Sequence, residues 1–317
     1  ASPAKARRSG SGEGGWSLCA LCGSRSPLVA CCCGSVARLR VSCALVALAA
    51  ICAGLATVLV AMSNVNTMPD LPPVCTSDCV EFDHSAWSSM LETYTVVTAD
   101  NSTAVLYDEL MNTVPGQTAR NIVAAGLADA PLARMNATAR FALFINAYNF
   151  MVINMVANHP CGGAPCASIN DVAPLFASVW KLPAGEVGGL SFSLDNIEHG
   201  FLRPTYHDPR VHSSLNCASV SCPPLRRTAY DASGMDATLD DQVAHWLATT
   251  GVQSVNVGAA TASISMIFDW YASDFDVVGG VPAFLAAHGD AALRAVASDA
   301  QATLTYYTYD WSLNSLR

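Results

Sequence analysis

The feature that most constrains this chain of 317 residues is an uncharged run over residues 41–62. As an α-helix, a run of that length is about 33 Å long, which matches a hydrocarbon core of roughly 30 Å. Arg38 and Arg40 precede the run, whereas residues 63–100 contain no Lys or Arg. Because basic residues stay on the cytoplasmic side of a membrane, we expect a cytosolic tail over residues 1–40 and an exoplasmic chain from residue 63 onward.

Two other interpretations of the apolar run are a cleaved signal peptide and a buried helix of a soluble protein. The apolar core of a signal peptide has about 7–15 residues and lies near the start of the chain. The run at residues 41–62 is longer and begins later. We therefore expect an uncleaved signal anchor, so that the protein crosses a membrane once. Plasma and secretory-pathway membranes fit such an anchor equally well.

The charge of the chain also differs on the two sides of the apolar run. The net charge is −9, yet residues 1–40 carry six basic side chains and one acidic one, which leaves 10 basic and 24 acidic side chains in the rest. A domain this acidic is a poor candidate for a nucleic-acid surface. We expect the partners to be the membrane, through residues 41–62, and a small-molecule or protein substrate, but no nucleic acid.

The cysteines divide at the apolar run as well. Seven of the 13 precede residue 53, and the run of three at 31–33 beside basic residues is typical of palmitoylation. The six that follow residue 62 are Cys75, Cys79, Cys161, Cys166, Cys217 and Cys222. An even number in an oxidising compartment predicts up to three disulfides, although six cysteines allow about 15 connectivities. Two glycosylation sequons, at Asn101 and Asn136, lie on the same side and agree with this topology.

Residues 63–80 contain three prolines and are predicted to form a stalk, followed by one globular domain over 81–317. The fold class we expect is α+β, dominated by helices, with a few short strands. The expected helices span 84–96, 138–159, 194–202, 209–216, 236–249 and 281–288, with a short one near 264–271. The expected strands span 253–257, 303–309 and 186–192, the last broken into a hairpin by Gly188 and Gly189. The helix at 138–159 is apolar almost all round, which indicates a core position.

Residues 195–222 form the one dense polar stretch of a chain in which only 13% of residues are charged. On helices, Asp195 would stand one turn from His199, and Asp208 one turn from His212. Cys217 follows directly. A thiolate beside an imidazolium with a carboxylate behind it is the requirement of thiol catalysis. This hypothesis makes Cys217 the nucleophile, His212 or His199 the base, and Glu198 or Asp208 the orienting carboxylate.

Other interpretations of the same stretch remain open. Its side chains can satisfy one another's hydrogen bonds between packed elements, and Cys217 can be bridged to Cys222. A metal site is a third alternative, but a His-x4-Cys-x4-Cys spacing is not usual for zinc, so we assign no metal ligands and no cofactor. The sequence also lacks a P-loop, a GxSxG elbow and an HExxH motif.

The apolar helix contains the polar side chains Asn146, Tyr148 and Asn149. A buried amide without a partner costs about 1–3 kcal/mol, so each amide must find one. We favour a structural role in which these amides hold loops against the core. The alternative is that an asparagine donates a hydrogen bond to a developing oxyanion.

Several ordered motifs together resemble the family called domain of unknown function 547. They are FALFINAYNF (141–150), SIND (168–171), VWKL (179–182), SLDNIEHGFLRP (193–204), DPRVHSSLNCASVSCPPL (208–225), FDWYASDF (268–275) and YDWSLN (309–314). The resemblance covers about residues 81–314 and implies no established activity. It adds a set of binding residues to the four catalytic candidates: Arg203, Asn146, Tyr148, Asn149, Asp208, Arg210 and Asn216. Members of the family from plants keep a cysteine at the Cys217 position but not at Cys222, and the loop at 161–166 is an insertion that its own bridge would close.

Two functions follow from these observations. The first is a membrane-anchored, Cys/His-dependent hydrolase or acyl transferase. The second is a non-catalytic binding or scaffold domain in which the same polar residues form a structural network. The state of Cys217 separates them, because a thiol that is held in a disulfide cannot act as a nucleophile.

Overall fold

The computed structural model describes residues 67–174 and 177–316, which all belong to one compact unit, Val58–Arg317. The predicted tail at 1–40, the anchor at 41–62 and the cysteines at 31–33 lie outside these residues. Helices dominate the described part, and its strands form small sheets of two or three strands. The predicted α+β class is therefore confirmed.

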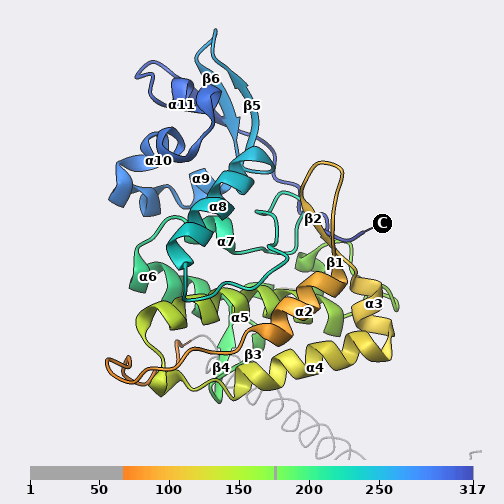
Figure 1. Cartoon of the computed structure of the whole chain (residues 1–317). Helices are drawn as coiled ribbons and strands as arrows, with labels where there is room; N and C mark the ends of the chain where they lie inside the picture. The colour runs from red at the N-terminus through yellow and green to blue at the C-terminus, as the bar shows by residue number, and fades with distance from the viewer. Residues whose placement is uncertain (1–66, 175–176, 317) are drawn as a thin grey trace, which may run out of the picture. The chain divides into compact units, whose positions relative to one another are not determined.

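Helix α5 (Ala137–Asn158) forms the centre of the first half of the domain (Figure 1). It begins where the side chain of Asn136 accepts a hydrogen bond from the backbone N–H of Ala139, which is an N-cap. Nearly all of its residues are buried, as expected for a helix that is apolar all round. Among the described residues this helix alone is long and apolar enough to span a membrane, but 89% of its most apolar window is buried inside the domain. It is the core helix that the sequence predicts.

Three further helices and a short hairpin surround α5. They are α2 (Ser85–Tyr94), the strands β1 (Thr95–Val97) and β2 (Thr103–Val105), α3 (Tyr107–Asn112) and α4 (Val114–Ala128). The buried Arg120 on α4 donates hydrogen bonds to the side chains of Asn154 and Asn158 on α5 at 2.8 and 2.6 Å. These bonds satisfy polar groups that would otherwise weaken the packing of an apolar helix.

The predicted Gly-Gly hairpin is present as strands β3 (Pro183–Val187) and β4 (Leu190–Ser193). Gly188 and Gly189 have φ values of 59° and 75°, which only glycine adopts readily. Short 3₁₀ turns precede this hairpin at η1 (Leu132–Arg134), η2 (Ile169–Val172) and η3 (Val179–Lys181). A π-helical turn, η4 (Asn196–Leu202), follows it and continues into α6 (Arg203–Tyr206).

The second half has its own apolar core. Its elements are α7 (Val211–Ser214), α8 (Met235–Ala248), β5 (Val252–Asn256), β6 (Thr261–Ile264), α9 (Ile267–Trp270), η5 (Ala272–Val278), α10 (Gly280–His288), α11 (Ala291–Ala297) and β7 (Thr303–Tyr306). Strand β6 pairs antiparallel with β5 and parallel with β7. Trp246, Phe268, Phe275 and Phe284 pack together and contribute most of the aromatic bulk of this core.

The chain after β7 returns to the first half and joins the two cores. The backbone N–H of Val220 donates to the carbonyl of Ser312, and that of Val105 on β2 donates to the carbonyl of Asn314, at 2.8 Å each. Residues 307–316 therefore lie across the loop at 217–222 before they reach β2. This path places side chains from the last ten residues beside the polar stretch that the sequence singled out.

The structure departs from the predicted elements in three ways. Helices α3, α4, α6 and α11 and strands β1, β2 and β6 were not predicted, since they are short or lack a clear periodicity. The helix predicted at 209–216 is limited to Val211–Ser214. The segment predicted as a stalk also packs against the domain over its described part, 67–80, because the buried Arg140 donates hydrogen bonds to the carbonyls of Pro72 and Pro73 at 2.8 and 2.6 Å.

Candidate functional site

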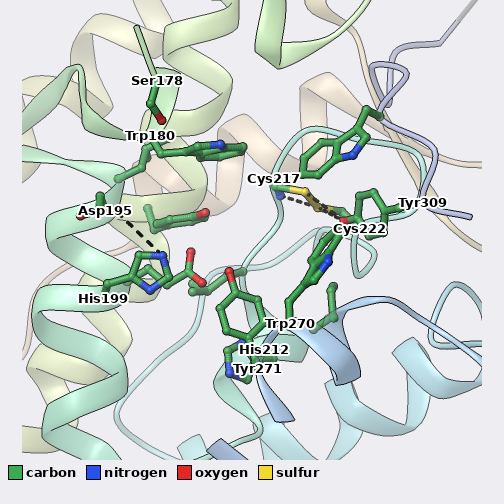
Figure 2. Close-up of a pocket in the computed structure, with 16 residues that line it drawn as sticks. Ser178, Trp180, Asp195, His199, His212, Cys217, Cys222, Trp270, Tyr271 and Tyr309 are labelled. Atoms are coloured by element: carbon green, nitrogen blue, oxygen red, sulfur yellow. Dashed lines mark hydrogen bonds and ion pairs between the residues drawn. A yellow bond between two sulfur atoms is a disulfide. The ribbon is translucent and has the colours of Figure 1, made fainter. Parts of the chain in front are cut away.

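A cavity of about 240 Å³ lies where residues of the two apolar cores meet (Figure 2). We call it the aromatic pocket, because six of the side chains that line it are tryptophan or tyrosine rings. The residues that line it are Tyr148, Ser178, Trp180, Leu194, Asp195, Glu198, His199, His212, Leu215, Cys217, Cys222, Ile267, Trp270, Tyr271, Tyr309 and Trp311. A cavity of this size holds a small organic molecule rather than a peptide.

Glu198 on η4 is the most deeply buried carboxylate of the pocket, with only 8% of its surface exposed. The hydroxyls of Tyr148 on α5 and Tyr271 both interact with this carboxylate. Burial raises the pKa of both phenols above their usual value, and the charge of Glu198 raises it further. Both hydroxyls therefore keep their protons and can donate to the carboxylate.

The placement of Tyr271 depends on a network behind the pocket. Its ring stacks on the imidazole of His212 with a centroid distance of 4.3 Å, and the guanidinium of Arg203 lies 4.7 Å from its centroid. Asp274 on η5 accepts hydrogen bonds from both of these groups, at 2.8 Å from His212 and 2.9 Å from Nη2 of Arg203. Although burial opposes it, these two donors hold the pKa of the Asp274 carboxyl well below its usual range.

A second carboxylate and a histidine lie nearer to the solvent. Asp195 and His199 stand one turn apart as predicted, with 3.9 Å between a carboxylate oxygen of Asp195 and Nε2 of His199. The side chains are 32% and 37% exposed, so this contact is weak. The other ring nitrogen of His199 lies against Nη1 of Arg203. His199 thus connects the pocket surface to the network around Asp274.

Four aromatic side chains form the remaining wall of the pocket. The rings of Trp270 and Tyr309 are 4.9 Å apart, those of Tyr309 and Trp311 are 4.7 Å apart, and Trp180 faces Trp311 at 6.4 Å. Trp180 comes from η3, whereas the other three come from the C-terminal part of the chain. The wall is therefore assembled from segments more than 80 residues apart in the sequence.

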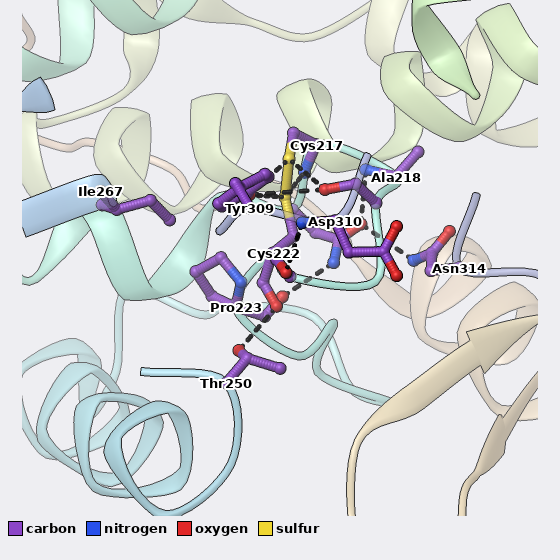
Figure 3. The surroundings of a disulfide bond; sticks show 12 residues. Cys217, Ala218, Cys222, Pro223, Thr250, Ile267, Tyr309, Asp310 and Asn314 are labelled. Atoms are coloured by element: carbon purple, nitrogen blue, oxygen red, sulfur yellow. Dashed lines mark hydrogen bonds between the residues drawn. A yellow bond between two sulfur atoms is a disulfide. The ribbon is translucent and has the colours of Figure 1, made fainter. Parts of the chain in front are cut away.

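Beside these rings, the pocket is lined by a disulfide between Cys217 and Cys222 (Figure 3). The sulfur of Cys217 also lies 3.2 Å from the hydroxyls of Ser219 and Tyr309. The other described cysteines pair in the same local way, Cys75 with Cys79 and Cys161 with Cys166. The loop at 161–166 is thus closed by its own bridge, as the resemblance implied.

Asn216 holds the same loop by hydrogen bonds. Its side chain accepts from the backbone N–H of Ala218 at 3.0 Å and donates to the carbonyl of Pro223 at 2.8 Å. Asn149 on α5 in turn accepts from the backbone N–H of Asn216 and donates to the carbonyl of Ser214, both at 2.8 Å. Asn149 and Asn216 therefore position the loop and do not face the pocket.

The four catalytic candidates, Cys217, His212, His199 and Glu198, all line this one pocket, and so does Tyr148. The predicted dyad is nevertheless not formed. Cys217 is bonded to Cys222, and Nε2 of His212 binds Asp274 instead of a thiol. The predicted row of Asp208 and His212 is also absent, because Asp208 pairs with Arg210 at 2.7 Å. Helix α7 is too short to carry such a row.

The other predicted binding residues lie outside the pocket wall. Asn146 binds both backbone polar groups of Tyr230, at 2.8 and 2.9 Å, and so holds a loop to the core. Arg210 binds Asp208, Asp236 and Asp240 at the surface. Among residues 67–174 and 177–316, no group of three or more His, Cys, Asp or Glu side chains is arranged to hold a metal ion.

Six residues of the site were not predicted from the sequence: Asp274, Trp180, Trp270, Tyr271, Tyr309 and Trp311. They belong to VWKL, FDWYASDF and YDWSLN, three of the four motifs of the resemblance from which no site residue was taken. The density of aromatic residues in two short motifs was the available signal. Spacing along the chain could not place them opposite η4.

A family model matches residues 132–247, and its description is "Protein of unknown function, DUF547". The match is shorter than the resemblance over 81–314. It contains Tyr148, Trp180, Glu198 and the Cys217–Cys222 loop, whereas the aromatic wall from Trp270 to Trp311 lies beyond it. No curated protein and no solved structure matches the chain.

Proposed function

The chain is a member of the DUF547 family, and on the chemistry of its pocket we propose that it is a binding module for a small molecule, held at a membrane with the pocket on the exoplasmic side. The observation that carries the proposal is the aromatic pocket itself, which combines six aromatic side chains with a buried carboxylate. Small-molecule sites are typically concave and apolar, with a few polar groups that fix orientation.

The disulfide favours binding over thiol catalysis. A thiolate is required for nucleophilic attack, and Cys217 has none while it is bonded to Cys222. Both histidines of the pocket have structural contacts in this arrangement: His212 stacks on Tyr271, and His199 contacts Arg203. Their role is then to hold the wall in place, as in the second of the two functions expected from the sequence.

The binding proposal is tested with four small probes: choline, 3,3-dimethyl-1-butanol, methyl β-glucoside and benzoate. They represent a cation, a neutral apolar molecule, a polyol and an anion. Because three of the six tryptophans line the pocket, binding of at least one probe is expected to change tryptophan fluorescence in a saturable way. If none of the four binds, the proposal is contradicted.

A pair of variants locates that binding. Ser178 is exposed at the pocket, so Ser178→Phe should block the pocket with little cost to the fold. Ser191 is an exposed serine on β4 outside the pocket, so Ser191→Phe is the matched control. We expect Ser178→Phe to abolish binding and Ser191→Phe to leave it unchanged. Equal binding by both variants would place the probe elsewhere.

Membrane attachment through residues 41–62 is the second part of the proposal. It is supported by the basic flank of that run and by three local disulfides, which are typical of an oxidising compartment. In sealed microsomes, protease added outside should digest the tail at 1–40 and leave the domain intact. Digestion of the domain would contradict this orientation.

Glycosylation at Asn101 and Asn136 would support the same orientation. The side-chain oxygen of Asn136 caps α5, so its sequon is best removed by Thr138→Ala. Asn101 has a φ of 62°, which an aspartate also tolerates, so Asn101→Asp removes the other sequon. Each change is expected to abolish one glycosidase-sensitive shift in mass.

Thiol catalysis is the second candidate, favoured by the meeting of Cys217, His199, His212 and Glu198 around one pocket. It requires a dithiol to reduce the bridge, which yields two protein thiols and leaves the reductant as a disulfide. The test is alkylation by iodoacetamide after mild reduction. This candidate predicts that Cys217 reacts at neutral pH much faster than Cys161, and it is contradicted by equal rates.

A further inference from the structure

The residues that line the aromatic pocket carry negative charge only. Asp195 and Glu198 are its two carboxylates, and no Lys or Arg is among the described residues that line it. The nearby guanidinium of Arg203 is held by both carboxylate oxygens of Asp274, so its charge is already neutralised. The pocket therefore repels anions and attracts cations.

Within the described part of the chain, Arg203 is the cation whose charge acts on Glu198, but it lies beyond ion-pair distance and is itself bound to Asp274. The carboxylate of Glu198 is more than nine-tenths buried and takes part in no ion pair there. The hydroxyls of Tyr148 and Tyr271 satisfy hydrogen bonds but do not compensate its charge. A buried carboxylate without a direct ion-pair partner is unfavourable for folding, and a cationic ligand would supply that partner.

The aromatic wall provides a second, independent feature that suits a cation. The faces of Trp and Tyr rings carry partial negative charge, and they attract a cation that lies within about 6 Å of the ring centre. Trp270, Tyr309 and Trp311 form a continuous cluster of such rings, and Trp270 is still 43% exposed. Figure 2 shows Tyr309 and Trp270 on the side of the pocket opposite Asp195 and His199.

From these two features we infer that the ligand of the pocket is a small organic ammonium cation, bound between the Glu198 carboxylate and the aromatic wall. This inference rests on the proposed binding function and names its ligand class. The volume of about 240 Å³ admits an alkylammonium head with a short substituent. A polyol could stack on the same rings, but it would leave Glu198 without a direct ion-pair partner.

The test compares choline with 3,3-dimethyl-1-butanol, which has the same shape but carries carbon in place of the charged nitrogen. The full chain is kept in a polyoxyethylene alkyl ether detergent, which contains neither an ammonium group nor a sugar. Binding is measured by tryptophan fluorescence and by calorimetry. We expect choline to bind at least about tenfold more tightly than its neutral analogue, and methyl β-glucoside to bind more weakly than choline.

Charge at Glu198 is tested by Glu198→Gln, which keeps the shape of the side chain. We expect this variant to bind choline and the neutral analogue with similar affinity. Its matched control is Glu186→Gln, which removes the charge of an exposed glutamate on β3 and should leave the tenfold preference intact. A preference that persists in Glu198→Gln would overturn the inference.

The wall is tested by Trp270→Leu, with Tyr306→Leu as the control for loss of an exposed ring outside the pocket. We expect Trp270→Leu to weaken choline binding about tenfold and Tyr306→Leu to have no effect. Equal loss in both variants would count against cation binding at this wall.

The outcomes separate the inference from the proposed function. If the neutral analogue, the glucoside or benzoate binds as tightly as choline and Ser178→Phe blocks that binding, the pocket is a binding site and the ligand class is wrong. If no probe binds, both proposals fail. If choline binds preferentially and the preference is lost in Glu198→Gln, both are supported.

Discussion

His212 donates a hydrogen bond from Nε2 to the carboxylate of Asp274 at 2.8 Å, and this contact decides the chemistry of the pocket. The same imidazole stacks on the ring of Tyr271, with a centroid distance of 4.3 Å. Asp274 also binds Arg203, so one carboxylate orients a histidine, an arginine and, through them, a tyrosine of the pocket wall. The histidine predicted as a catalytic base thus helps to hold the wall of the pocket in place.

Loss of the Asp274 carboxylate should therefore both destabilise the domain and loosen the pocket. Asp274→Asn removes the negative charge and replaces one of the two acceptor oxygens by an amide donor, and we expect a loss of about 2–3 kcal/mol in the free energy of unfolding at pH 7. Since interactions in the fold lower the pKa of Asp274, its contribution to stability is present above about pH 4 and is lost as the pH falls below that value. Urea unfolding at a series of pH values measures this contribution.

Asp276→Asn is the matched control for this change, because Asp276 lies on the same turn and is exposed. We expect it to alter the unfolding free energy by less than about 0.5 kcal/mol. Equal effects of the two variants would show that Asp274 has no special role.

The Cys217–Cys222 bridge should contribute less to stability than Asn216. The bridge closes a loop with a sequence separation of only 5, so we expect the double change to serine to cost about 2 kcal/mol or less. Asn216→Ala removes an acceptor from Ala218 and a donor to Pro223 in a buried site, at a cost of roughly 2–4 kcal/mol. Denaturant unfolding of the two variants compares them directly.

Peptide mapping without reduction provides the accompanying check. It should recover the pairs Cys75–Cys79, Cys161–Cys166 and Cys217–Cys222. A free thiol at Cys217 would favour the thiol enzyme over the binding module.

The stability of Glu198→Gln distinguishes the hypothesis of a ligand-binding pocket from that of a purely structural network. If Glu198 is retained for a cationic ligand, removal of its buried charge should leave the unfolding free energy of the ligand-free protein unchanged or raise it by about 1 kcal/mol. A structural network predicts the opposite, a loss of about 2 kcal/mol or more. Thermal unfolding in the absence of added amines distinguishes the two.

The stability of the domain should fall in mild acid because of His84. Burial lowers the pKa of His84 to about 4, against the opposing charges of Asp231 and Asp83. Its Nδ1 faces the side-chain amide of Asn146 at 3.1 Å and accepts a hydrogen bond only when unprotonated. The unfolded chain therefore binds this proton first, and we expect stability to decrease by roughly 2–3 kcal/mol between pH 6.5 and pH 4.

His84→Gln keeps an acceptor for Asn146 but cannot titrate, so it should flatten the profile in this range. His159→Gln, a change at an exposed histidine, serves as the control and should leave the slope as it is. An unaltered slope in His84→Gln would assign the acid sensitivity to another group.

Local pattern was enough to identify the core helix and the polar stretch that supplies one wall of the pocket. The helix at 137–158 follows from an apolar run that has no polar face, and the hairpin at 183–193 follows from two adjacent glycines. The motifs around Glu198 and Cys217 likewise indicated residues that meet at one cavity. Each of these inferences depends on neighbours within a few turns of chain, which is the range over which periodicity and turn chemistry act.

Only the tertiary structure decided which partners these residues have. From the sequence, Cys217 could pair with either a histidine or Cys222, and in the structure it is bonded to Cys222. His212 binds Asp274, which is 62 residues away, and not Asp208, which is four residues away. The aromatic wall is formed because residues 307–316 return across the loop at 217–222. Such long-range contacts depend on how the two apolar cores dock against each other, and the spacing of residues along the chain does not predict this docking.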